Sequence, residues 1–82
     1  AHTYFDLFEP ERRAISRLLE AMRTKILERD RDVRGFNVGM NCGEVAGQTV
    51  PHAHVHLIPR REGDVSNPRG GVRGVIPGKA DY

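Results

Sequence analysis

Three histidines that alternate with apolar residues constrain this chain more than any other feature of its sequence. His52, His54 and His56 are separated by single apolar residues, and further apolar residues follow as far as Ile58. A period of two is typical of a β-strand, in which successive side chains point to opposite faces. The pattern predicts a strand from about Val50 to Ile58. Its three imidazoles would form a row on one face, about 7 Å apart, with the apolar residues directed into a core.

A row of imidazoles fits two kinds of chemistry. Histidine has an ordinary pKa of about 6.5, so a neutral imidazole can act as a nucleophile at pH 7, while a neighbour donates a proton or holds an anionic oxygen. Neutral imidazoles are also common zinc ligands, although residues along one strand converge on one ion less readily than ligands from several elements. A histidine-rich surface strand without such a role is the third interpretation, and the row alone leaves all three open.

The segment that precedes the row predicts an anion-binding loop. It runs from Asn41 to Thr49 and contains glycines at positions 43 and 47, which allow the backbone to approach a ligand closely. Exposed backbone N–H groups in such a loop can bind an anion, and Gln48 and Thr49 can hydrogen-bond a phosphate or a leaving group. A simple hairpin turn is the alternative interpretation of the glycines.

The first third of the chain predicts a helix. Apolar residues recur at three- and four-residue spacing from Ile15 to Ile26, which is typical of an amphipathic helix packed on a sheet. Pro10 suits the first helical turn, where its missing N–H costs nothing. The helix should end before Gly35, within the charged residues 28–34.

The remaining segments predict an α+β fold. Alternation over residues 36–41 indicates the first strand of a hairpin whose second strand carries the histidines, and Pro59 ends that second strand or marks an edge. Residues 60–82 are rich in glycine and proline and predict an irregular arm. We therefore expect one amphipathic helix on an antiparallel sheet, with the histidines on the last strand.

Size and charge argue against several classes of protein. The chain of 82 residues is one domain at most, and such a domain buries only about 60–65% of the surface that its unfolded chain exposes. Thirteen Lys and Arg against 11 Asp and Glu give a net charge of +2, too small for a surface that coats nucleic acid. Neither a membrane span nor a signal peptide is expected. Cys42 is the single cysteine, which favours a reducing compartment and predicts a cytoplasmic location.

The residues from Gly47 to Arg60 resemble the signature of the histidine-triad family. That signature is His-φ-His-φ-His-φ-φ, where φ is apolar, and all three histidines and all four apolar positions match. The Gly-Gln-Thr at residues 47–49 is similar to the version in the fragile-histidine-triad branch and in many bacterial relatives. The resemblance also covers the helix, the hairpin and the tail around Pro68, and it implies a histidine-triad-like fold.

The resemblance further implies that residues 1–82 are the C-terminal portion of a single histidine-triad domain. Domains of that family begin with further strands and a short helix, then a Pro-x-Arg-His segment, whose end Ala1-His2 resembles. The preceding strands normally build much of the nucleoside pocket. Family members typically form homodimers through the helix and the hairpin, so a homodimer is expected here.

The family consists of nucleotide hydrolases and transferases that act at the α-phosphate of a nucleoside phosphate. The resemblance implies that His54 is the nucleophile and forms a covalent nucleotidyl-histidine, while His52 and His56 orient it, stabilise phosphoryl oxygens and help to protonate the leaving group. The residues expected at the phosphate are Asn41, Gln48 and Thr49. The expected substrate is a dinucleoside polyphosphate or an AMP conjugate, with no metal or other cofactor. A nucleotide-binding module without turnover is the alternative, and a zinc site is a less favoured one.

Overall fold

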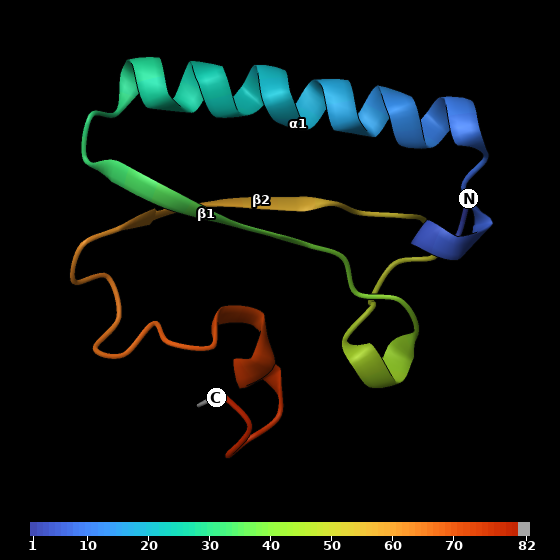
Figure 1. Cartoon of the computed structure of the whole chain (residues 1–82). Helices are drawn as coiled ribbons and strands as arrows, with labels where there is room; N and C mark the ends of the chain where they lie inside the picture. Colours follow the sequence, from blue (N-terminus) through green and yellow to red (C-terminus); the bar gives the residue numbers. More distant parts are fainter. Residues whose placement is uncertain (81–82) are drawn as a thin grey trace.

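The computed structural model describes residues 1–80, in which one long helix covers a two-stranded antiparallel sheet. Helix α1 spans Glu9–Arg29, and strands β1 (Val33–Gly39) and β2 (His56–Arg61) form the sheet. Three short 3-10 helices complete the described part of the chain: η1 (Tyr4–Asp6), η2 (Glu44–Ala46) and η3 (Gly71–Val75). Helix α1 lies along one face of the sheet, and the loop with η2 and the arm with η3 lie on the other side (Figure 1). The predicted α+β class is confirmed.

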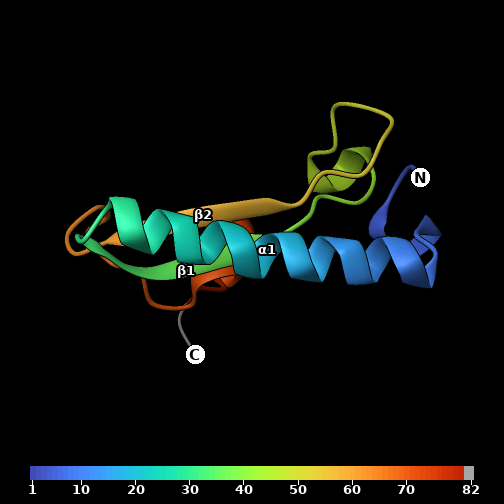
Figure 2. The same cartoon turned by 90° about the horizontal axis from the view of Figure 1, so that it is seen from above.

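Helix α1 begins and ends as the sequence predicts. Pro10 lies in its first turn, and the backbone N–H of Phe8 donates to the Glu11 carboxylate at 2.8 Å. That bond satisfies one of the donors that a helix start leaves without an intrahelical partner. The helix ends at Arg29, inside the charged run. Seen from above, it follows the length of both strands (Figure 2). No helix within residues 1–80 is long and apolar enough to cross a membrane.

The apolar stripe of α1 faces the apolar residues that alternate with the histidines. A shallow hollow between them is lined by Ile15, Leu18, Leu19, Met22, Ala53, Val55 and Leu57. The core is small, because within residues 1–80 only Leu7, at 8% exposure, and Val33, at 5%, are buried apolar residues. Helix and sheet therefore meet through side chains that are half-buried or exposed.

Strand β2 begins later and ends later than the predicted strand. The prediction placed it from residue 50 to residue 58, whereas the ladder starts where Gly39 pairs with His56 and continues to Arg61. Strand β1 ends at Gly39, so residues 50–55 have no partner strand within residues 1–80. Pro59 lies inside β2 opposite Phe36, and a proline is tolerated there because β2 has one partner strand among the described residues.

Two other boundaries differ from the sequence prediction. Strand β1 starts at Val33 and contains a bulge between Val33 and Gly35, so it lies earlier than the predicted residues 36–41. Arg60 belongs to β2 and not to the irregular arm, and the arm contains η3. Residues 81–82 of the predicted arm lie outside the described part of the chain.

Candidate active site

All six residues predicted for the site line one surface hollow. It has a volume of about 240 Å³ and lies where the chain enters β2, beside the loop that contains η2. Its lining consists of Asn41, Gly47, Gln48, Thr49, His52, His54 and His56. The fold therefore brings the glycine loop and the histidine row into contact with the same volume.

The three imidazoles stand in sequence along one side of this hollow. The ring centroids of His52 and His54 are 5.0 Å apart and those of His54 and His56 are 6.4 Å apart. Only His56 belongs to β2, because the other two precede the ladder. The predicted alternation is nevertheless present: all three histidines are exposed, and the residues at 53, 55 and 57 are half-buried. His54 thus has an imidazole on each side.

The glycine loop brings Asn41 against Gly47. Gly47 has a φ of 96° in the left-handed region and ends η2, and a Cβ built on it would lie 3.4 Å from the Asn41 amide nitrogen. A side chain at this position would meet both backbone strain and the Asn41 carboxamide. Glycine at 47 therefore lets the Asn41 carboxamide approach the loop backbone beside the histidines.

Gln48 lines the hollow, but its carboxamide is engaged by the backbone. Its oxygen accepts from the N–H of Gly43 at 2.7 Å, and its nitrogen donates to the carbonyls of His2, at 2.7 Å, and Val50, at 3.0 Å. The Gln48 N–H also donates to the Gly43 carbonyl at 3.1 Å. The sequence suggested a phosphate contact for this side chain and gave no signal for these bonds.

The first residues of the chain contact the histidine segment, which sequence reasoning also missed. The N–H of Ala53 donates to the carbonyl of Ala1 at 2.9 Å, and His2 accepts from Gln48 through its own backbone carbonyl. Ala53 lies between two of the three histidines. Backbone contacts of this kind leave no side-chain pattern in a sequence.

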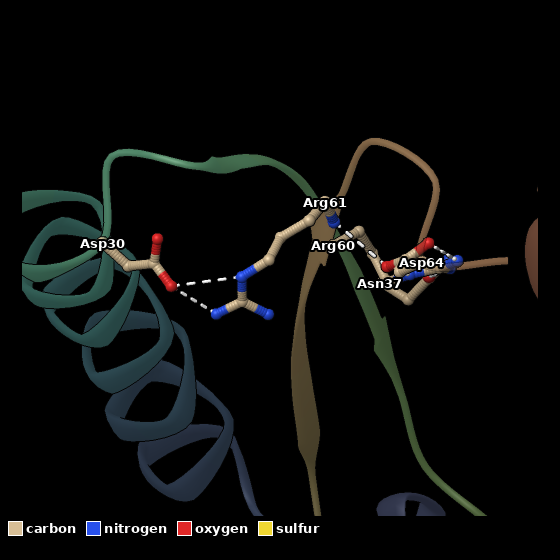
Figure 3. A network of polar contacts seen from close by, with 5 residues as sticks. All are labelled: Asp30, Asn37, Arg60, Arg61 and Asp64. Carbon is tan, nitrogen blue, oxygen red and sulfur yellow. Dashed lines mark hydrogen bonds and ion pairs between the residues drawn. The ribbon is translucent and has the colours of Figure 1, made fainter.

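A network of polar contacts holds the far end of β2 (Figure 3). Arg60 donates to both carboxylate oxygens of Asp64, at 2.8 and 2.9 Å, and to the amide oxygen of Asn37 in β1 at 2.5 Å. Arg61 forms an ion pair with Asp30 at the end of α1. The hydrogen bonds from Arg60 hold the pKa of the Asp64 carboxyl well below its usual range, and those from Arg61 lower the pKa of Asp30. The network joins both strands to the helix and the turn at residues 62–64.

The histidine row does not form a ready cluster of metal ligands. Within residues 1–80, no three His, Cys, Asp or Glu side chains are placed to hold one ion. Zinc needs ligand nitrogens about 2.0–2.1 Å from a single centre, whereas these rings follow one another along the chain. A row of rings suits contacts to several atoms of one extended ligand better than contacts to one ion.

Comparison with known proteins decides the family. The HIT domain model matches residues 3–63, which include the glycine loop and all three histidines of the row. The chain belongs to the HIT domain family. No solved structure matches it.

Curated relatives of this HIT chain match over short segments. An asymmetrical bis(5'-nucleosyl)-tetraphosphatase of Schizosaccharomyces pombe is 45% identical over 42 residues, 51% of this chain and 23% of the relative. A bis(5'-adenosyl)-triphosphatase of Dictyostelium discoideum is 38% identical over 50 residues, 60% of this chain and 34% of the relative. An adenosine 5'-monophosphoramidase of Candida albicans is 42% identical over 43 residues, 48% of this chain and 28% of the relative. The HIT chain thus matches about a third or less of the length of each.

Proposed function

We propose that this HIT chain supplies the catalytic centre of a nucleotide hydrolase or transferase that acts at the α-phosphate of a nucleoside phosphate. The observation that carries the proposal is the single hollow in which the histidine row meets Asn41, Gln48 and Thr49. The relatives named above are a tetraphosphatase, a triphosphatase and a phosphoramidase. The substrates in their names have a nucleotidyl group in common and differ in what is attached to it, which supports a dinucleoside polyphosphate or an AMP conjugate as substrate.

The first step is attack of His54 on the α-phosphorus. The lone pair of an imidazole nitrogen forms a P–N bond, and the bond from phosphorus to the leaving group breaks with its electron pair. The leaving group takes a proton from a neighbouring imidazolium, for which His52 and His56 are available at centroid distances of 5.0 and 6.4 Å from His54. The product of this step is a covalent nucleotidyl-histidine.

The second step regenerates the histidine. A water molecule attacks the phosphorus, gives up a proton to a flanking imidazole, and the P–N bond breaks with its electron pair returning to His54. A nucleoside monophosphate is released. Another nucleophile in place of water would make the same centre a transferase. Both steps use one site because the middle imidazole is both attacking and leaving group.

Charge on the phosphoryl oxygens is stabilised by the wall of the hollow. The Asn41 carboxamide and the Thr49 hydroxyl can donate hydrogen bonds there, and both residues line the same volume as the imidazoles. Such preorganised donors act mainly by positioning and by electrostatic stabilisation, which are the chief demands of phosphoryl transfer. The mechanism requires no metal or other cofactor.

Two broader proposals concern the rest of the protein. We infer that residues 1–82 form the C-terminal portion of one HIT domain, which accords with matches that cover 23% to 34% of three relatives. We infer also that the protein forms a homodimer. Exposed apolar side chains along α1 and its entry support this, among them Phe5 at 79%, Phe8 at 76% and Leu18 at 62%. A cytoplasmic location, without a nucleic-acid or membrane partner, remains a prediction from the sequence.

The proposal is tested by comparing the wild type with His54→Ala on diadenosine tetraphosphate and on adenosine 5'-phosphoramidate. We expect turnover of at least one substrate by the wild type and its loss in the variant. His2→Ala is the matched control, because the side chain of His2 is exposed and lies outside the hollow. Nucleotide binding without turnover in the wild type would favour the non-catalytic module. Turnover that needs added zinc and is lost with a chelator would favour the metal site.

A further inference from the structure

The face of β2 that carries His56 continues to Arg60. The two residues are four apart in the strand, so their side chains point to the same side of the sheet. In the ladder, His56 lies opposite Gly39 and Arg60 lies opposite Gly35. Asn37 lies between these two glycines in β1 and shares their face. It is therefore the residue of β1 that the Arg60 side chain can reach on the histidine face.

Arg60 links the two strands across this face (Figure 3). Its Nη1 donates to the Asn37 amide oxygen at 2.5 Å, while Nε and Nη2 donate to the Asp64 carboxylate at 2.8 and 2.9 Å. The guanidinium makes this combination possible because its donors point in fixed directions from one plane. The arm covers the link, since η3 lies against β1 and a Cβ built on Gly71 would lie 3.3 Å from the Asn37 amide nitrogen. A hydrogen bond that is partly shielded from water is electrostatically stronger than one on an open surface.

The connection between β1 and β2 is too long to fix how the strands are aligned. A two-residue turn would set the register, but here residues 40–55 connect the strands. Strand β1 also contains a bulge between Val33 and Gly35, where the register changes. The apolar pattern opposes a slip of one residue, because that slip would turn every side chain to the other face. A slip of two residues keeps the faces, yet it would move His56 along β1 by about 7 Å.

The neighbours of Asn37 on this face make the link specific to one register. Gly35 and Gly39 have no side chains, so after a slip of two residues in either direction Arg60 would meet a glycine in place of Asn37. We propose that Arg60 and Asn37 are positioning residues, which lock the register of β2 on β1 and so hold His56 at the hollow. The kinetic consequence rests on the proposed nucleotidyl transfer, whereas the structural consequence does not.

Two substitutions at Asn37 test the link and leave the pair between Arg60 and Asp64 in place. Asn37→Leu removes the acceptor at similar size, and Asn37→Asp keeps an oxygen for the guanidinium. Arg61→Gln is the matched control, because it breaks the ion pair with Asp30 at the same end of β2 and keeps the Asn37 link. NMR relaxation dispersion at individual amides and steady-state kinetics are measured on the full chain of each variant, with circular dichroism to show that the fold is retained.

We expect the amides of Gly39 and His56 to show exchange on the microsecond-to-millisecond timescale in Asn37→Leu. The wild type, Asn37→Asp and Arg61→Gln should not show it. The exchange reports a second register, because loss of a hydrogen bond to a charged group raises the slipped population about tenfold or more. Where turnover is measurable, kcat of Asn37→Leu falls about three- to tenfold with KM within about twofold of the wild-type value, since His56 is held less firmly and the substrate contacts are kept.

Absence of this exchange in Asn37→Leu would overturn the proposal, whether or not the protein has activity. Equal exchange in Arg61→Gln would also overturn it, because the effect would then be a general loosening of that end of the sheet. Absence of turnover in the wild type would count against the proposed function alone, since the exchange measurement still decides the role of the link. If Asn37→Leu fails to fold, Arg60→Lys decides the outcome, because a single ammonium cannot hold Asp64 and Asn37 together as the guanidinium does.

Discussion

His54 differs from the other histidines in having an imidazole on each side. The ring centroids of His52 and His56 are 5.0 and 6.4 Å from that of His54, which is the arrangement that the proposed nucleotidyl transfer requires. His2 lies outside the hollow and contributes its backbone carbonyl. The alternation at residues 52–57 predicted that the three imidazoles share one face, because the apolar residues between them point to the opposite face.

Substitution of the three histidines should separate the nucleophile from its neighbours. We expect His54→Ala to lower kcat by about 10⁴-fold or more, as the loss of a nucleophile does. His52→Ala and His56→Ala should each cost about 10²-fold, the usual range for a group that transfers a proton. Single-turnover rates with a dinucleoside polyphosphate provide the measurement. Equal losses at all three positions would contradict the assigned roles.

Among the residues of the loop, we expect substitution of Gly47 to lower stability and activity most. Gly47→Ala places a Cβ 3.4 Å from the Asn41 amide nitrogen on a backbone with φ of 96°. We expect a loss of about 1–2 kcal/mol in the free energy of unfolding, measured by urea titration, together with reduced kcat. Gly39→Ala is the control, because nothing lies within 4 Å of a Cβ there. Equal effects of the two changes would show that Gly47 has no special conformational role.

At the scale of elements, sequence reasoning identified the type of each segment better than its limits. The helix was predictable because Pro10 and the apolar spacing are local signals. The start of β2 was not, because it depends on where β1 ends: His56 is the last residue with a partner, Gly39, although the alternation runs back to residue 52. The Val50 carbonyl accepts from the Gln48 side chain and the Ala53 N–H donates to the Ala1 carbonyl, and hydrogen bonds to the backbone follow no pattern that the sequence displays.

The polar network at the end of β2 should make stability depend on pH in the acid range. The pKa of Asp64 is lowered from its ordinary 3.8 by the hydrogen bonds from Arg60. The charged form is thus favoured in the folded state. The stabilising contribution is present above pH 3.8 and is lost as the pH falls below that value towards the lower folded pKa. The stabilising contribution of Asp30, whose pKa is lowered by its hydrogen bond from Arg61, should likewise be lost as the pH falls.

Asp64→Asn tests this dependence. We expect the free energy of unfolding to fall less between about pH 6 and about pH 2.5 in the variant than in the wild type, since the variant has already lost one of the two ion pairs. Glu62→Gln, an exposed acid of the same turn, serves as the control and should follow the wild type. Denaturant titrations at several pH values supply the data. If the free energy of unfolding changes equally with pH in the wild type and in Asp64→Asn, the Arg60 contact does not stabilise the fold.

The whole molecule combines a well-formed site with a small core. Within residues 1–80, Leu7 and Val33 are the only buried apolar residues, and large apolar side chains such as Phe5 and Phe8 are exposed at 79% and 76%. A domain of this size buries a smaller fraction of its surface than a larger one, so its own core contributes only marginal stability. The limited burial was expected from the length of the chain, whereas the position of the exposed side chains, at the entry to α1, required the structure.

The proposed homodimer predicts that thermal stability depends on protein concentration. Association removes apolar surface from water and shifts the unfolding equilibrium by mass action. We expect the Tm to rise by several degrees over a hundredfold increase in concentration, with sedimentation velocity showing a dimer at the upper end. The paired substitution Phe5→Ser and Phe8→Ser should lower the dimer fraction. A monomer with an unchanged Tm over that range would contradict the dimer.

The central claim is covalent catalysis by His54, and intact-protein mass spectrometry after rapid mixing with diadenosine tetraphosphate tests it most directly. The quench must be alkaline, because a P–N bond to histidine is labile in acid. We predict that wild type and His2→Ala gain the mass of one adenylyl group, that peptide mapping places it on His54, and that His54→Ala gains nothing. Turnover without an adduct, or an adduct that persists in His54→Ala, would contradict the account.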